Sequence, residues 1–238
     1  NCLSRLIRFS LLTICLLPAP AVADSVAPPP TIEHHQLALE LSPDSHRLIA
    51  TDRVTVAGGF PGQELAFSLA PTLLLERVED LTHCQDPCEF APSVPFARDR
   101  SSSQAESQRI LLKQPPANQA GGSIRLKFVY HGVIDDPPRD PRHLRFVTPS
   151  ETAGHIGPEG VYLSSESQWY PDLDDSLATY DVRITLPEGW AAVTQGTAQA
   201  DASRWIVSTK SEALTVVANR FVVKIRNWKA KSGQAVQL

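Results

Sequence analysis

Methionine is absent from the 238 residues, and cysteine occurs only four times. The chain therefore lacks an initiator residue, and residues 235–238 have the apolar alternation of a new strand. We expect the chain to be a piece of a longer protein. Any function that needs a further domain would then depend on residues outside this sequence.

An excess of basic residues is also missing. The formal net charge is −4, and residues 1–23 contain Arg5 and Arg8 but no acid, so the remainder is more acidic still. Binding to nucleic acid through phosphates needs clustered lysine and arginine, and it is not expected here. Residues 24–238 suit one large domain or two small ones.

The common catalytic motifs are absent as well. The sequence has no Gly-x-Ser-x-Gly elbow, no glycine-rich phosphate loop and no His-Glu-x-x-His zinc helix. Beyond the first residues, no segment has the periodicity of an amphipathic helix of useful length. We therefore predict no catalytic residue, no metal ligand and no cofactor within this chain.

Residues 1–23 have the organisation of a helical signal peptide. Arg5 and Arg8 precede the apolar residues 9–17, and small residues at 21–23 form a cleavage site. The apolar stretch is shorter than the about 20 residues that a membrane-spanning helix needs. We predict export to the periplasm or the cell exterior, with no transmembrane span in the mature protein. An uncleaved anchor or a buried helix is the alternative.

Short strands separated by turns fill most of the remainder. Proline-rich residues 24–33 predict an extended linker. Leu37, Leu39 and Leu41 then alternate with other residues before a turn that begins at Pro43, which predicts a β-hairpin. About eleven such strands predict an all-β fold, either a sandwich or a strongly bent sheet with mostly antiparallel pairing.

Two cysteines remain once the leader is removed. Cys84 and Cys88 lie close together in the sequence HCQDPCEF. In an exported protein this spacing favours a local disulfide. A metal half-site is the alternative, but no second cysteine or histidine pair lies at ligand spacing.

The histidines and acids form no recognisable metal motif. His34 and His35 are adjacent, so on a strand they point to opposite faces. Ordinary surface roles are expected for His46, His83, His131, His143 and His155. A calcium site or a carboxylate pair is an alternative for Glu166, Asp172, Asp174 and Asp175, although the spacing of an EF-hand is absent.

Residues 160–190 combine aromatic bulk, carboxylates and a clear strand pattern. They read GVYLSSESQWYP, then DLDD, then a strand that ends in LPEGW. This segment resembles the N-terminal β-domain of the aminopeptidase N family of zinc metallopeptidases, in which a Phe-Pro-Cys-x-Asp-Glu-Pro motif precedes such a strand. Four positions match the motif: Tyr170, Pro171, Asp174 and Asp175. Asp172 replaces its cysteine and Ser176 its last proline.

The resemblance covers residues 34–230 and also rests on LALELSPDSHRLIATDRVTV, LKFVYHGVI and LTVVANRFVV. It implies a saddle-shaped β-domain that covers one side of a peptidase active site, with residues 231–238 starting the next segment. It further implies zinc in a catalytic domain outside this chain, that domain as a partner, and peptide substrates for the full-length protein.

The family's β-domain commonly contributes a polar residue near the free amino group of the substrate. Glu166 and Gln168 are the candidates, and hydrogen bonding within a turn is the alternative for both. A different interpretation of the chain is a secreted β-sandwich module that binds a glycan or a protein. Trp169, Trp190 and Trp228 could then stack on a sugar, or pack in the core. A third interpretation keeps the family scaffold without a functional zinc motif.

Overall fold

The computed structural model describes residues 29–58, 64–84, 88, 90–99, 107–113, 122–137, 152–173, 176–200, 203–222, 227–229 and 235–237. In these residues sixteen strands and two short 3-10 turns occur, and no α-helix. The predicted all-β, sandwich-like fold is confirmed. The predicted signal peptide lies outside the described residues. Within the described part, no helix is long and apolar enough to cross a membrane.

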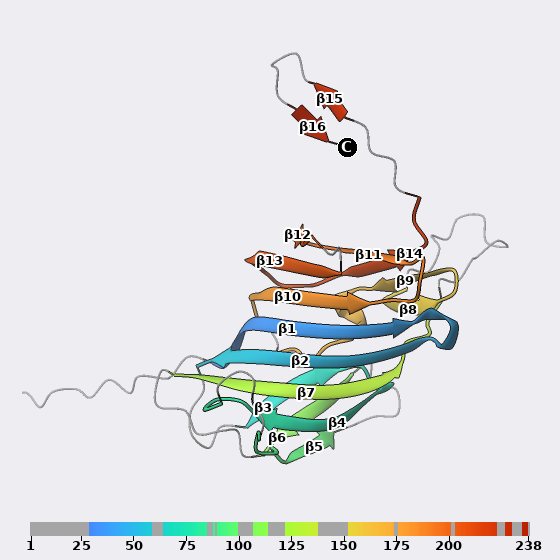
Figure 1. Cartoon of the computed structure of the whole chain (residues 1–238). Helices are drawn as coiled ribbons and strands as arrows, with labels where there is room; N and C mark the ends of the chain where they lie inside the picture. Colours follow the sequence, from blue (N-terminus) through green and yellow to red (C-terminus); the bar gives the residue numbers. More distant parts are fainter. Residues whose placement is uncertain are drawn as a thin grey trace, which may run out of the picture.

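A seven-stranded sheet forms the main layer (Figure 1), and its strands follow the order β12-β13-β10-β1-β2-β7-β4. All neighbouring pairs are antiparallel except β1 and β10. The bounds are β1 Thr31–Ser42, β2 Arg47–Ala57, β4 Leu73–Asp80, β7 Ser123–Val133, β10 Ala178–Thr185, β12 Thr197–Ala198 and β13 Arg204–Ser211.

The hairpin predicted from the leucine alternation is the pair β1–β2, joined by the 3-10 turn η1 (Pro43–Ser45). β1 begins earlier than expected, inside the segment that was predicted as linker. The reason is that Thr31 pairs with Ala57 and that the side chain of Ile32 is buried. A proline-rich composition before a strand does not show where backbone pairing starts.

Smaller sheets complete the fold. One has the order β3-β6-β5 and another the order β11-β14-β9-β8, and β15 pairs with β16. The bounds are β3 Leu65–Leu69, β5 Phe96–Asp99, β6 Gln108–Leu112, β8 Gly154–Gly157, β9 Gly160–Leu163, β11 Ala191–Thr194, β14 Val216–Asn219, β15 Asn227–Lys229 and β16 Ala235–Gln237. Figure 1 shows the β3-β6-β5 sheet beside β4 and β7, where the rings of Phe67 and Phe128 lie 4.8 Å apart.

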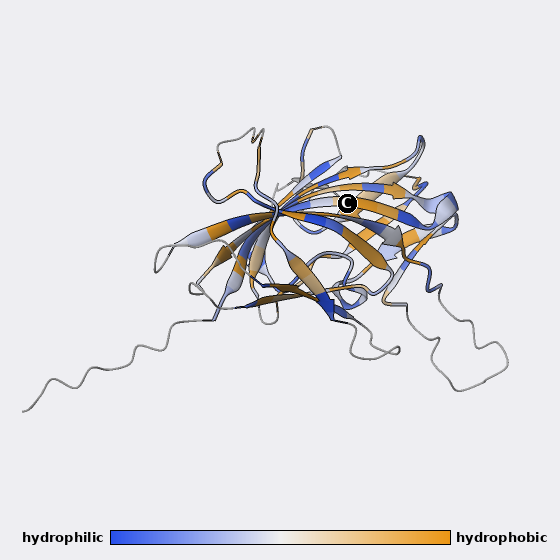
Figure 2. Cartoon of the chain, turned by 90° about the horizontal axis from the view of Figure 1, so that it is seen from below, coloured by the Kyte–Doolittle hydropathy of each residue, from blue (hydrophilic) through white to orange (hydrophobic). Residues whose placement is uncertain are grey.

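Alternation along the strands separates the core from the solvent. Figure 2 shows apolar and polar residues alternating along the strands. Strand β7 is an example, because its buried side chains are those of Ile124, Leu126, Phe128 and Tyr130. Each large apolar side chain buried in this way stabilises the fold by about 1.5–3 kcal/mol.

A histidine–aspartate pair lies within this apolar core. Nδ1 of His35 on β1 is 2.7 Å from Oδ2 of Asp52 on β2, and both side chains are 0% exposed. The His35 ring stacks on Tyr180 at 5.1 Å and meets the edge of Tyr170 at 5.2 Å. Buried polar groups are costly unless they are paired, so this contact fixes the register of β1 and β2 in the core.

Removing one member of the pair tests this role. His35→Leu is expected to lower the free energy of unfolding by about 3–5 kcal/mol, because it leaves the Asp52 carboxylate buried without its partner. The double variant His35→Leu/Asp52→Val should lose less than the single variant. Urea denaturation followed by tryptophan fluorescence measures both.

His131→Leu is the matched control, since His131 pairs with Glu76 at 2.8 Å in a solvent-exposed position. Exposed pairs contribute at most about 1 kcal/mol, so its loss should stay below that value. The coupling would be contradicted if the losses of His35→Leu and of Asp52→Val, measured singly, added up to the loss of the double variant.

Candidate functional site

Glu166 and Gln168, the residues predicted to contact a substrate, line the same pocket. It has a volume of about 540 Å³. Glu166 lies in the 3-10 turn η2 (Ser165–Ser167), which follows β9, and Gln168 caps that turn. We call this cavity the η2 pocket; the residues that line it are Ser68, Ser165, Glu166, Gln168, Tyr170, Asp172, Leu173, Ser176, Leu177 and Glu212.

The backbone of Gln168 is held firmly. It adopts the left-handed conformation with φ 51°, and its N–H donates to the Ser165 carbonyl at 2.8 Å. Its carbonyl accepts a hydrogen bond from the Ala70 N–H at 2.7 Å. The side-chain oxygen Oε1 is buried and has no hydrogen-bond partner within the described residues. Glu166, by contrast, is exposed at the pocket surface.

Carboxylates give the η2 pocket its charge. Glu166, Asp172 and Glu212 line it, and its described lining contains no lysine, arginine or histidine. Three acids around one cavity attract a cation and repel an anion, although solvent weakens each interaction. The pocket is therefore suited to a positively charged group such as an amine.

Tyr170, which lines this pocket, and its neighbour Trp169 belong to the core. Trp169 is 0% and Tyr170 1% exposed, and the Tyr170 hydroxyl accepts a hydrogen bond from the Leu214 N–H at 3.3 Å. Asp172 forms a β-bridge with Ser68 on β3. The Ser176 hydroxyl accepts a hydrogen bond from the Ile32 N–H on β1 at 3.0 Å. The part of the chain that contains Tyr170 is thus attached to the main sheet, to the β3-β6-β5 sheet and to the β11-β14-β9-β8 sheet.

Burial decides between the two interpretations of Trp169. Trp169 cannot stack on a sugar, because its side chain is fully buried. Trp190 is partly buried and the Arg220 guanidinium lies 5.6 Å from its ring centre. The side chain of Trp228 lies outside the described part. Aromatic residues have the same sequence signal in a core and on a binding surface, which explains why the sequence left both open.

Burial perturbs the tyrosines near the pocket. It raises the pKa of Tyr180 to about 12, with a further rise from the charges of Asp172 and Asp52 and an opposing effect of the hydrogen bond to Tyr170. Burial also raises the pKa of Tyr170 and that of Tyr130. The hydroxyl of Tyr170 is therefore a neutral hydrogen-bonding group at physiological pH.

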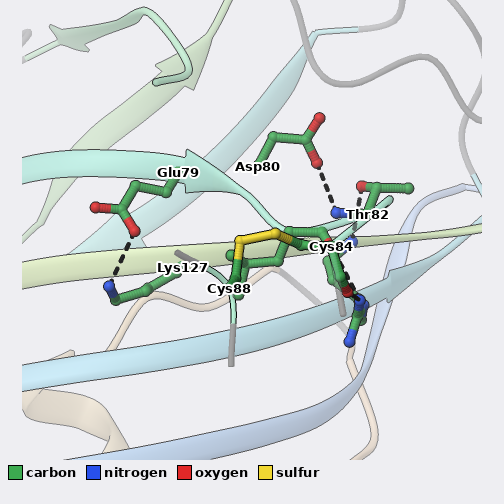
Figure 3. The surroundings of a disulfide bond; sticks show 8 residues. Glu79, Asp80, Thr82, Cys84, Cys88 and Lys127 are labelled. Atoms are coloured by element: carbon green, nitrogen blue, oxygen red, sulfur yellow. Dashed lines mark hydrogen bonds and ion pairs between the residues drawn. A yellow bond between two sulfur atoms is a disulfide. The ribbon is translucent and has the colours of Figure 1, made fainter. Parts of the chain in front are cut away.

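The disulfide lies at a different place, after β4 (Figure 3). Cys84 and Cys88 are bonded, with Cα atoms 5.5 Å apart. Nearby, the Thr82 N–H donates to Asp80 at 2.8 Å and Lys127 Nζ pairs with Glu79 at 2.9 Å. The side chain of Arg125 donates to the carbonyl oxygens of Leu81 and Cys84. The loop is thus fastened to β7, which is a structural role.

A cluster of His46, Asp135 and His155 was not predicted from the sequence. The expected surface role is wrong for His155, whose side chain is only 5% exposed. These residues come from three distant parts of the chain, and one ligand atom from each lies within 4.8 Å of the others. No spacing of residues in the sequence indicates such a cluster, because pairing between distant segments creates it. Asp174 and Asp175, two of the matched motif positions, lie outside the described residues.

Comparison with known proteins shows a shared fold. No family model and no curated protein sequence matches the chain. Among solved structures, the M1 zinc metallopeptidase from Deinococcus radiodurans aligns with a TM-score of 0.55 and 17% identity, over 87% of this chain and 46% of that one. Yeast LTA4 hydrolase aligns with a TM-score of 0.56 and 11% identity, over 84% of this chain and 30% of that one.

The chain therefore spans less than half the length of these solved structures. The resemblance inferred from residues 160–190 is confirmed at the level of the fold. Identities this low do not transfer the roles of single residues, so the function of the η2 pocket is argued from its own geometry.

The raised pKa of Tyr180 predicts a loss of stability at alkaline pH. Both states keep tyrosine neutral below about pH 10; above it the unfolded chain loses protons that the folded chain retains. Stability should thus fall as the pH rises from 10 through the Tyr180 pKa of about 12. Urea midpoints measured across this range should fall less steeply for Tyr180→Phe than for the parent protein. Equal slopes would show that Tyr180 does not contribute.

Proposed function

We propose that this chain is the non-catalytic β-domain of an exported zinc aminopeptidase-like metallopeptidase. In this proposal the domain predicted over residues 34–230 walls one side of the substrate cleft. Its η2 pocket helps to bind the free N-terminus of a peptide. The fold shared with M1 metallopeptidases supports the first part, and the acidic pocket supports the second.

The observation that carries the proposal is the position of Glu166 and Gln168 in one acidic cavity. A peptide N-terminus is an ammonium group below its pKa of about 7.7–8.0, with donors only. It needs acceptors and negative charge around it. The exposed carboxylate of Glu166 supplies both, while the buried attachment of Gln168 to Ala70 keeps the turn in place.

The hydrolytic chemistry would belong to a domain outside this chain. Zinc there would activate a water molecule for attack on the first peptide bond. The residues of this chain do not form the family's zinc motif, since His-Glu-x-x-His does not occur in the sequence. These residues would bind the amino group, orient the peptide and limit access to peptides with a free N-terminus.

Export is part of the same proposal. Residues 1–23 have the signal-peptide pattern, and the bonded pair of Cys84 and Cys88 suits an oxidising compartment outside the cytosol. Cleavage before Asp24 would release a protein that starts with the proline-rich residues. N-terminal sequencing of the protein recovered from the exporting host checks this, and a first residue near Asn1 would contradict it.

Kinetics of the full-length gene product test the role of the pocket. Glu166→Gln should raise KM for aminoacyl substrates about five-fold with little change in kcat, as expected for the loss of about 1 kcal/mol of binding common to ground and transition states. N-acetylated peptides lack the positive charge. They should not compete with substrate for the parent protein or for the Glu166→Gln variant.

Glu188→Gln is the matched control. Glu188 is exposed in the turn between β10 and β11 and does not line the η2 pocket, so its replacement should leave KM unchanged. Equal effects of the two variants would contradict a specific role of Glu166. A full-length product without any hydrolysis of aminoacyl substrates would contradict the aminopeptidase assignment itself.

A further inference from the structure

Three distant segments meet beside the β1–β2 turn. His46 ends η1, Asp135 follows β7, and His155 lies in β8. The backbone holds them together, because the Ile134 N–H donates to the His46 carbonyl at 3.0 Å and the Ile156 N–H donates to the Ile134 carbonyl at 2.9 Å. Asp135 also forms a β-bridge with His155. The positions of the three side chains are therefore set by main-chain pairing.

Two of the separations between their side-chain atoms are close to those of a metal site. Nδ1 of His155 is 3.3 Å from Oδ1 of Asp135, and Nδ1 of His46 is 3.6 Å from the same oxygen. Zinc–ligand bonds of about 2.0–2.1 Å in a tetrahedron place neighbouring ligand atoms about 3.3 Å apart. Two imidazoles and one carboxylate form a donor set that zinc and similar transition metals accept readily.

The state of the His155 ring is the second observation that indicates a cation. Its Nε2 is 2.5 Å from Oε1 of Glu159, and a carboxylate can only accept, so Nε2 carries a proton. Its Nδ1 is buried and has no hydrogen-bond partner within the described part of the chain. The contact between Nδ1 and the Asp135 carboxylate needs a positive charge between the two atoms, which a proton on Nδ1 or a bound metal ion supplies.

The surroundings of His155 match the outer shell of a metal ligand. Histidines that bind metal usually donate their second ring N–H to a carboxylate or a backbone carbonyl, which fixes the tautomer. Glu159 does this for His155. Gly157 makes room for the pair, because a Cβ atom there would collide with Nε2 of His155 and lie 2.8 Å from Oε2 of Glu159.

Solvent can reach the cluster from one side. Asp135 is 44% and His46 33% exposed, and Asp135 lines a pocket of about 600 Å³ that also touches Glu166 in η2. His46 donates from Nδ1 to the Ile156 carbonyl at 2.6 Å. To bind a metal, the half-buried ring either turns to present Nε2, or releases the carbonyl and loses the Nδ1 proton. His46 is therefore the ligand that adjusts on binding.

We propose that His46, Asp135 and His155 bind one divalent transition-metal ion of the zinc class, with Glu159 orienting His155 and water completing the coordination. This site would be structural, because it ties the β1–β2 turn, the end of β7 and strand β8 together. The inference is independent of the proposed peptidase function.

Metal titration of the full chain tests the site. After treatment with a chelator, the protein should bind one equivalent of Zn²⁺, raise its Tm on binding, and give the intense visible absorption of a tetrahedral site with Co²⁺. Asp135→Asn and His46→Asn should each weaken Zn²⁺ binding at least ten-fold and remove the Co²⁺ absorption. Asparagine is chosen at His46 because it tolerates the left-handed backbone there, where φ is 53°.

Two further variants make the result decisive. Glu159→Gln should weaken binding about 10–100-fold, as the loss of an outer-shell carboxylate does. His131→Gln, which alters the histidine paired with Glu76 on the same sheet, should bind as the parent does. Failure of the parent to bind Zn²⁺, with NMR showing both His155 ring nitrogens protonated between Asp135 and Glu159, would overturn the proposal. An equal loss in His131→Gln would do so as well.

Discussion

The architecture depends on the burial of Tyr170 where the sheets meet. Its ring meets the edges of His35 and Tyr180 in the main sheet, and its hydroxyl accepts the Leu214 N–H just before β14. Neighbouring Asp172 forms a β-bridge with Ser68 on β3, in the β3-β6-β5 sheet. Tyr170 and its neighbour Asp172 thus connect three sheets. The turn that presents Glu166 lies just before this residue in the chain, so the packing of the core positions the candidate site.

The polar contacts inside the core add specificity to that arrangement. A pair such as His35 and Asp52 contributes little net stability compared with apolar residues of similar size. It does, however, penalise every alternative register of β1 against β2, because a slipped strand would leave a carboxylate in the core without a partner. Apolar residues alone would tolerate more than one packing of a sheet as large as this one.

Local signals were sufficient for the parts of the fold that are close in sequence. The β1–β2 hairpin followed from the leucines and Pro43, and β10 followed from the alternation around Tyr180. Very short strands such as Thr197–Ala198 have no period to detect. Long-range pairing was equally invisible, and it decides the candidate sites. Glu166 and Gln168 were found through a family motif, whereas His46 and His155 meet only because Ile156 pairs with Ile134.

The parallel pairing of β1 with β10 has a consequence for biosynthesis. Contacts across this pair join residues 145 positions apart, as between His34 and Thr179. A growing chain can form the hairpin early, but β1 keeps one unpaired edge until residues 178–185 have been made. Such non-local topologies fold slowly, and open edges invite association with other chains. Until β10 pairs with it, that edge of β1 is open to pairing with a second copy of the chain.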